Sequence, residues 1–368
     1  MSSYPKVEYA EEGMRDGIQI EDAGIPVEDK LRLLDALGET GLEHIVVGSF
    51  VNPRWTPQMA CMDELMKRFT PKPGVKYTAL LMNEQAVERA KAYSPPLTIE
   101  GGVVNVRCHL CDVFVRRNTN RSQAQEMERW PQVVARAREA GVKEARIGMA
   151  AAFGSNWLGE FSLDDHLRVM EQQHRVCDEA GLAVTHVRIS DEMSWTMPHR
   201  VEELLEAIKK RWPKITNFNL HFHNGRGMAL VSIYAALKVL EPTDTAALEG
   251  ALGGIGGCPY CGNGRATGLP ATEDLLHMLE AMGIETGVDF DKLIDCVWLL
   301  EEIVGHPTFG HVSKAGALPR SAEKWYPMDL PFIETLEQAK HFKLGPQVYQ
   351  GAIYPWKEPI HSLKRPNG

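Results

Sequence analysis

Short segments rich in β-forming residues alternate with longer amphipathic segments along most of the chain. In the longer segments apolar residues recur three and four positions apart, which is the period of a helix. For example, Val27, Leu31 and Leu34 share one helical face, and Gly41 follows them as a helix stop signal. A strand and helix rhythm of this kind is typical of repeated βα units around a parallel sheet.

The number of predicted strands favours a parallel (β/α)8 barrel, the TIM barrel, although periodicity alone also allows a doubly wound open sheet. Helical segments separate the strands. The predicted strands are Lys6 to Ala10, His44 to Phe50, Lys76 to Leu81, Gly102 to His109, Glu144 to Ala150, Ala183 to Ser190, Asn217 to Phe222 and Thr245 to Leu252.

The βα rhythm ends near residue 290. The sequence that follows is rich in Pro, Gly and aromatic residues, and its aromatic content argues against disorder. We therefore expect a catalytic barrel domain over residues 1–290 and a C-terminal extension, packed on the barrel, over residues 291–368.

Composition narrows the class of protein. The chain has 368 residues, 44% of them hydrophobic, and its 40 basic and 49 acidic residues give a net charge of -9. The basic residues are scattered, which argues against a nucleic-acid partner. No apolar run approaches the roughly 20 residues that span a bilayer, so we expect a cytoplasmic protein without a membrane partner. Its 7 cysteines are an odd number, which favours reduced thiols over a disulfide framework.

Polar and reactive residues gather where the predicted strands end, which is where barrel enzymes place their chemistry. Arg15 and Asp16 follow the first strand, and Asp191 follows the sixth. His221 and His223 stand two residues apart in the seventh strand, so both imidazoles point to the same face. Two His and one Asp suit a divalent metal, compatible with Mg, Mn, Zn or Fe, and oxygen ligands from a substrate would favour Mg²⁺ or Mn²⁺. The alternative is a pair of structural histidines.

The stretch "GGIGGCPYCGNG", Gly253 to Gly264, places Cys258 and Cys261 in the Cys-Pro-Tyr-Cys motif of glutaredoxins. A redox motif belongs at the start of a helix in a small thioredoxin-like domain, whereas this one lies deep in a long chain among glycines. A thiol on a flexible loop at the barrel mouth could instead act as an acid or base, and inert thiols are the third interpretation.

Four quoted stretches stand in the same order as in a known family. They are "MRDGIQ", "GSFVNPRWTPQMA", "HFHNGRGMAL" and "GGIGGCPY" with the later "ATEDLLHMLEAMGIETGV". Over about residues 5–295 the chain resembles 3-hydroxy-3-methylglutaryl-CoA (HMG-CoA) lyase, of the metal-dependent lyase and Claisen-synthase superfamily of TIM barrels. The resemblance implies retro-Claisen cleavage of HMG-CoA, or of a shorter relative such as citramalyl-CoA, to acetyl-CoA and a keto acid.

The resemblance also implies roles for individual residues. Arg15 would stabilise the thioester enolate, Cys258 would protonate or guard it, and Asp191 would assist proton transfer. The divalent metal would be held by Asp16, His221 and His223.

Two positions depart from the family pattern. Val46 stands where the family has a glutamate, and Leu269 stands where it has a metal-binding asparagine. Asn263, or water, is expected to take the place of that asparagine. These changes affect the expected substrate more than the expected reaction.

Further expectations concern CoA and partners. The CoA phosphates need cations near the mouth, for which the candidates are Arg54, Arg116 and Arg117. An acyl-CoA is the expected ligand, and a homodimer is the expected assembly. A Claisen-condensing synthase is the rival function, because "GHVSKAG" at residues 310–316 resembles the condensing enzymes, and a thiol redox protein is a more distant alternative.

Overall fold

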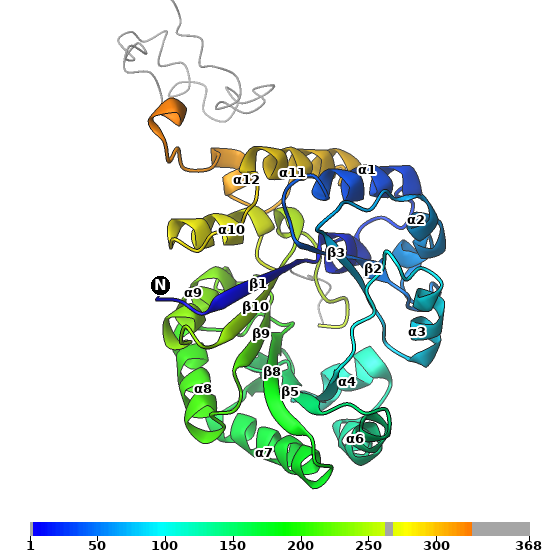
Figure 1. Cartoon of the computed structure of the whole chain (residues 1–368), viewed down its shortest axis with the longest axis vertical. Coiled ribbons are helices and arrows are strands. Elements are labelled where there is room, and N and C mark those ends of the chain that lie inside the picture. The colour runs from blue at the N-terminus through cyan, green and yellow to red at the C-terminus, as the bar shows by residue number, and fades with distance from the viewer. Residues whose placement is uncertain (1–2, 262–267, 326–368) are drawn as a thin grey trace, which may run out of the picture. The chain divides into compact units, whose positions relative to one another are not determined.

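Eight parallel strands form one curled sheet in the computed structural model, which describes residues 3–261 and 268–325 (Figure 1). The first residue of each strand lies within one residue of the first residue of a predicted strand. The strands are β1 (Lys6–Glu11), β2 (His44–Ser49), β3 (Lys76–Leu80), β4 (Val103–His109), β5 (Glu144–Ala150), β8 (Ala183–Asp191), β9 (Asn217–Phe222) and β10 (Thr245–Gly250).

The sheet curls because its first and last strands pair with each other. Their order is β3-β2-β1-β10-β9-β8-β5-β4, and β1 pairs with β10 in parallel register from Lys6 opposite Thr245 to Glu11 opposite Gly250. Within the described chain, β3 and β4 are the two ends of the paired series. The prediction of a (β/α)8 barrel is confirmed.

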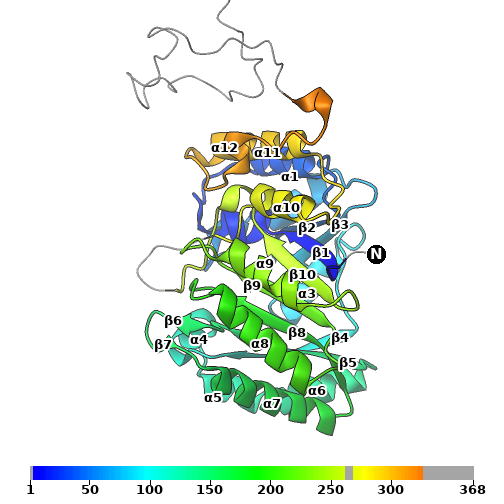
Figure 2. The same ribbon diagram turned by 90° about the vertical axis from the view of Figure 1, so that its left-hand side faces the viewer.

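Helices surround the strands on the outside (Figures 1 and 2). Their apolar faces carry the predicted helical period: in the first helix Leu31, Leu34 and Leu37 are all buried. The helices are α1 (Val27–Leu37), α2 (Met62–Arg68), α3 (Glu84–Lys91), α4 (Asp112–Thr119), α5 (Gln123–Glu128), α6 (Trp130–Glu139), α7 (Leu163–Glu179), α8 (Pro198–Arg211), α9 (Ala229–Val239), α10 (Thr272–Ala281) and α11 (Phe290–Val304).

Side chains alternate along the strands between a hydrophobic core and a polar barrel interior. On β2, Ile45 and Val47 belong to the hydrophobic core that the helices cover. In the interior, Arg188 of β8 donates to Asn219 of β9 and to Glu249 of β10. Charged groups therefore fill part of the interior that most barrels of this kind fill with branched apolar side chains.

The chain divides into two compact units after Gly310. The predicted domain boundary at residue 290 coincides with the start of α11, whose buried residues Leu293, Val297 and Leu300 belong to the hydrophobic core of the first unit. The described part of the second unit contains α12 (Val312–Ala315) and a short 3-10 turn at Ala322–Lys324. The extension predicted to pack on the barrel remains a prediction.

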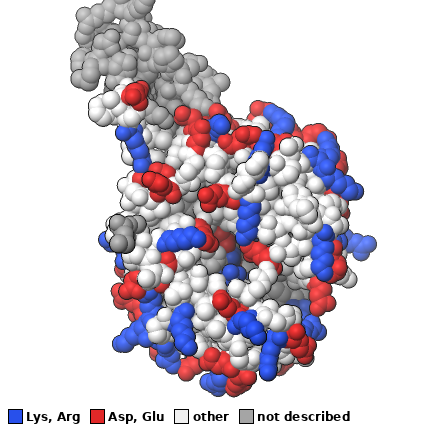
Figure 3. Space-filling model, viewed as in Figure 1, with Lys and Arg blue, Asp and Glu red and all other residues white. Residues whose placement is uncertain are grey.

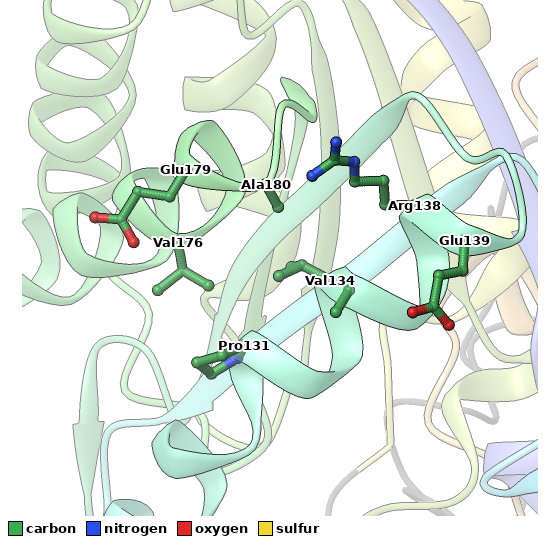
Figure 4. A pocket seen from close by; sticks show the side chains of 8 residues that line it. Pro131, Val134, Arg138, Glu139, Val176, Glu179 and Ala180 are labelled. Atoms are coloured by element: carbon green, nitrogen blue, oxygen red, sulfur yellow. The ribbon is translucent and has the colours of Figure 1, made fainter.

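The described surface away from the strand ends includes a face of mixed charge and a groove between two helices. Acidic and basic side chains are interspersed on the face seen in Figure 3. No helix among the described residues is both long and apolar enough to cross a membrane. A groove of about 470 Å³ runs between α6 and α7 on the outside of the barrel (Figure 4). None of the predicted site residues lines it; its lining is Pro131, Val134, Ala135, Arg138, Glu139, Val176, Glu179 and Ala180.

Candidate active site

Three predicted metal ligands meet at the carboxyl ends of the strands. Asp16, His221 and His223 are all buried, and each offers one ligand atom within 4.8 Å of the others. The Nε2 atoms of the two histidines lie 3.2 Å apart. Asp16 comes from the single π-helical turn Gly13–Gly17 that follows β1, whereas the histidines come from the end of β9.

The carboxylate of Asp16 has one satisfied and one unsatisfied oxygen. Its Oδ1 accepts hydrogen bonds from Arg15 Nη1 at 3.0 Å and from Gln19 Nε2 at 2.6 Å. Its Oδ2 is buried and has no partner among the described residues. Burial acts to raise the pKa of Asp16, but Arg15 and the two imidazoles outweigh burial and lower it. A buried, ionised oxygen that faces two imidazole nitrogens fits a divalent cation.

His221 is oriented by a partly buried ion pair. Its Nδ1 donates to Glu249, which also accepts from the two terminal nitrogens of Arg188 at 2.6 and 2.8 Å. Burial acts to raise the pKa of Glu249, yet Arg188 and His221 hold that pKa well below its usual range. With its Nδ1 proton committed to Glu249, His221 presents the lone pair of Nε2 toward Asp16 and His223, as a metal ligand does.

The glycine-rich segment after β10 packs directly on the Asp16 turn. Gly256 has a φ of +96°, and a Cβ atom placed there would lie 2.3 Å from the carbonyl oxygen of Asp16. Only glycine allows this approach without strain. Gln19 joins the two segments, because its Nε2 donates both to Asp16 and, at 3.1 Å, to the carbonyl oxygen of Gly257. Cys258 is the next residue and is half-buried.

Glu11 fastens the ends of β1 and β10 together. Its fully buried carboxylate accepts from the backbone N–H groups of Gly13 at 2.7 Å and Leu252 at 2.8 Å, and from the hydroxyl groups of Tyr9 and Thr272. Burial raises the pKa of Glu11 to about 7, although these hydrogen bonds oppose the rise. The first turn of the site and the glycine-rich segment therefore share one anchor.

Asp191 lies at the end of β8 with one oxygen free. Its Oδ2 accepts from the backbone N–H of Thr196 at 2.5 Å, and its buried Oδ1 has no partner among the described residues. Burial raises its pKa to about 6. The backbone carbonyl of Asp191 accepts from the N–H of His223 at 3.1 Å, so the predicted acid lies beside a predicted metal ligand.

The two thiols of the Cys-Pro-Tyr-Cys motif have different environments. Both are free. Cys261 is buried and its Sγ donates to the carbonyl oxygen of Glu192 at 3.1 Å. The hydrogen bond with Cys258, together with burial, raises the pKa of Cys261. This raised pKa concerns the second cysteine of the motif, so it leaves the redox and acid-base interpretations of Cys258 to be separated by experiment.

The predicted CoA cations are less closely tied to the site. Arg54 and Arg116 are exposed, and Arg116 pairs with Asp112 at 2.6 Å. Arg117 stacks on the ring of Trp157 at 5.5 Å and donates to the carbonyl oxygen of Tyr260 at 3.2 Å. The predicted ligand Asn263 lies outside the described residues, and the two departures from the family pattern, Val46 and Leu269, are both buried.

Sequence reasoning missed four polar residues of the site, namely Glu12, Gln19, Arg188 and Glu249. Glu12 accepts from Arg15 Nε at 2.7 Å, and it is buried. A signal was present for Arg188 and Glu249, because each is a charged residue inside a predicted strand whose neighbours are apolar. No such signal marks Gln19, whose two partners lie on different segments.

A (β/α)8 barrel with two histidines and one aspartate at its carboxyl end defines a barrel enzyme whose site can hold a divalent metal. The sequence model of the HMGL-like family matches residues 6–299. The chain belongs to this family, whose curated relatives are carbon–carbon lyases.

Two relatives illustrate the similarity in sequence. The hydroxymethylglutaryl-CoA lyase YngG of Bacillus subtilis is 32% identical over 83% of this chain and 95% of its own length. The 3-hydroxy-3-isohexenylglutaryl-CoA/hydroxymethylglutaryl-CoA lyase of Pseudomonas aeruginosa is 34% identical over 84% of this chain and 97% of its own length.

Solved structures of HMG-CoA lyases are similar to this chain as well. The HMG-CoA lyase of Bacillus subtilis superposes with a TM-score of 0.68 at 29% identity, covering 85% of this chain and 98% of that structure. An HMG-CoA lyase from Acinetobacter baumannii, in complex with coenzyme A and 3-methylmalate, gives a TM-score of 0.69 at 27% identity over 87% of this chain and 98% of its own.

Proposed function

We propose that this protein is a divalent-metal-dependent lyase that cleaves a 3-hydroxyacyl-CoA bearing a carboxylate into acetyl-CoA and a keto acid. The observation that carries the proposal is the cluster of Asp16, His221 and His223, with its unsatisfied carboxylate oxygen, in a chain of the HMGL-like family. The substrate we propose is HMG-CoA or a shorter relative such as citramalyl-CoA.

Retro-Claisen cleavage has two electrostatic needs: the substrate hydroxyl must lose its proton, and the departing acetyl-CoA must be stabilised as an enolate. Asp16, His221 and His223 would hold a divalent ion, with Mg²⁺ or Mn²⁺ favoured over Zn²⁺, and such an ion would supply a Lewis acid for the hydroxyl. Arg15 supplies a fixed cation for the enolate oxygen. The side chain of Arg15 is only 12% exposed, so its charge is little screened by water.

Protein groups then move the protons. The free Oδ1 of Asp191 accepts the hydroxyl proton, and a pKa of about 6 makes this carboxylate a stronger base than an exposed aspartate. The electron pair of the broken carbon–carbon bond passes to the enolate. Cys258, which follows the carbonyl that Gln19 binds, donates the proton that converts the enolate to acetyl-CoA.

The altered positions bear on which substrate is used. Leu269 is 1% exposed and offers no ligand atom, so the described residues supply three metal ligands, and we propose Asn263 or water as a further one. We propose Arg54, Arg116 and Arg117 as cations for the CoA phosphates. The first unit, which includes α11, is the proposed catalytic unit. We further propose a homodimeric assembly and a cytoplasmic location.

A coupled release assay tests the proposal. Chelator-treated protein receives Mg²⁺ or Mn²⁺ and is offered HMG-CoA and citramalyl-CoA in parallel, with acetyl-CoA, acetoacetate and pyruvate quantified. We expect metal-dependent acetyl-CoA, and the keto acid identifies the substrate. No cleavage of either compound by a protein that binds Mn²⁺ would overturn the lyase, and condensation of acetyl-CoA with a keto acid would then identify the rival synthase.

The Cys258→Ser variant separates the lyase from the redox alternative. We expect the variant to bind Mn²⁺ as tightly as the wild type and to cleave substrate more slowly, because it lacks the proton donor. A wild type with thiol-transfer activity that Cys258→Ser abolishes, and without metal-dependent cleavage, would establish the redox protein instead.

A further inference from the structure

The guanidinium of Arg15 is held on two sides by two carboxylates. Nε donates to Glu12 Oε2 at 2.7 Å, and Nη1 donates to Asp16 Oδ1 at 3.0 Å. These two carboxylates engage Nε and Nη1 and leave Nη2 available for a substrate oxygen. The position of that nitrogen depends on both carboxylates.

Glu12 is an unusual residue for this location. It is 5% exposed, and the charges nearest to it include Glu249 and His221 as well as Arg15. Burial and the like charge of Glu249 raise the pKa of Glu12, and Arg15 is the main group that opposes this rise. A buried carboxylate that pairs with one cation fixes the geometry of that cation.

The neighbouring strand β2 explains why the carboxylate of Glu12 matters at this location. Glu11, the last residue of β1, pairs with Ile45 of β2, and Glu12 and Val46 are the residues that follow this pair in their two segments. Val46 is buried yet does not belong to the hydrophobic core that contains its neighbours Ile45 and Val47, which places it on the interior face. Val46 is the position where the resemblance leads us to expect a glutamate.

We infer that Glu12 is the positioning residue that holds Arg15 in place, as a carboxylate supplied directly after β1 instead of one supplied by β2 at Val46. Glu12 does not itself touch substrate. It fixes Nε and thereby the orientation of the guanidinium, and it keeps the guanidinium from turning fully onto Asp16, a proposed metal ligand. The kinetic part of the test rests on the proposed function, and the spectroscopic part does not.

The experiment compares Glu12→Val, Glu12→Gln and the double variant Glu12→Val with Val46→Glu. Glu8→Gln is the matched control, because Glu8 lies on the strand that leads to Glu12, is exposed, and pairs with Lys6 instead of Arg15. Thermal melting of all variants, with Val46→Glu alone as the tolerance control, establishes that each one folds.

We expect Glu12→Val to lower kcat about 100-fold with little change in KM, as for a lost contact to a charge that develops in the transition state. Glu12→Gln keeps an acceptor but loses the charge, so its loss is expected to be smaller. The double variant should regain at least about 10-fold of the lost kcat, because a carboxylate returns to the same guanidinium. Glu8→Gln should match the wild type.

The Nε–H signal of Arg15 in ¹H–¹⁵N spectra, assigned with Arg15→Lys, reports its position without any substrate. It should be sharp in the wild type, lost to solvent exchange in Glu12→Val and restored in the double variant. An unchanged signal and a kcat within threefold of the wild type in Glu12→Val would overturn the inference. A folded double variant without recovery would refute the equivalence of the carboxylates at positions 12 and 46. If the wild type cleaves nothing, the proposed function fails, and the signal alone decides the role of Glu12.

Discussion

Replacement of Glu249 by Gln tests whether the partner of His221 controls the metal site. The wild-type carboxylate accepts from His221 Nδ1 and from two nitrogens of Arg188 at 2.6 and 2.8 Å. The amide has the same shape but only one accepting oxygen and no charge. It therefore cannot satisfy both His221 and Arg188, and the imidazole loses the group that fixes its tautomer.

The magnitude follows from these contacts. Loss of the carboxylate behind a ligating histidine lowers metal affinity by about 10- to 100-fold, or about 1.4 to 2.8 kcal/mol. Removing one member of a buried ion pair destabilises the fold by about 3 to 5 kcal/mol. We expect the lower end of that range or less for the metal-free protein, because the side chain of Arg188 is 28% exposed.

Calorimetric titration with Mn²⁺ and urea unfolding of the metal-free protein measure the two effects separately. The double variant Glu249→Gln with Arg188→Met is the informative control, because it removes the uncompensated cation as well. Its stability should recover in part while its Mn²⁺ affinity stays low. Mn²⁺ affinity of Glu249→Gln within twofold of the wild type would refute the role that we assign to Glu249.

Two further predictions concern the segments that frame the site. Burial raises the pKa of Glu273 from 4.5 to about 8, and its Oε1 has no partner among the described residues, so the folded state binds this proton more tightly than the unfolded state does. The stabilisation by the protonated Glu273 carboxyl is therefore complete below about pH 4.5 and is lost as the pH rises through 8. The free energy of unfolding should fall over this range by about 3 to 5 kcal/mol at most. Glu273→Gln should flatten urea-unfolding stability between pH 5 and 8.5, and an unaltered slope would contradict this. Gly256→Ala should lower stability by at least about 1 to 2 kcal/mol, because a positive φ is costly for alanine and its Cβ would meet the Asp16 carbonyl oxygen. Thermal melting and Mn²⁺ titration check the Gly256 variant, and an unchanged melting temperature with unchanged affinity would count against the close packing.

Much of the fold could be predicted because its signals are local. Each strand is a short run of β-forming residues between helical segments, and pairing of the first strand with the eighth follows from their number. The cluster of Asp16, His221 and His223 was also within reach of the sequence, since residues at the ends of parallel barrel strands converge on one face. The spacing of two residues between His221 and His223, at the end of one strand, was enough to predict that both imidazoles point to the same face.

The groups that orient those ligands could not be predicted, because their contacts depend on register between distant strands. Glu249 meets Arg188 from 61 positions away in the chain and meets His221 from 28 positions away. Glu12 read as one more acidic residue in the charged stretch "EEGMRDG". Only the folded barrel shows that it is buried against Arg15.

The amide of Gln19 gives the site a constraint that extends beyond any one ligand. One nitrogen serves both Asp16 and the carbonyl of Gly257, so a shift of the glycine-rich segment changes the hydrogen bond that a metal-binding carboxylate receives. Because coupling between two binding events is reciprocal, a substrate that shifts this segment and a metal bound at Asp16 change each other's affinity by the same factor. Metal binding and the position of the glycine-rich segment are thus linked through one nitrogen, and a loop taken from a relative keeps this link only where its backbone places a carbonyl at the position of Gly257.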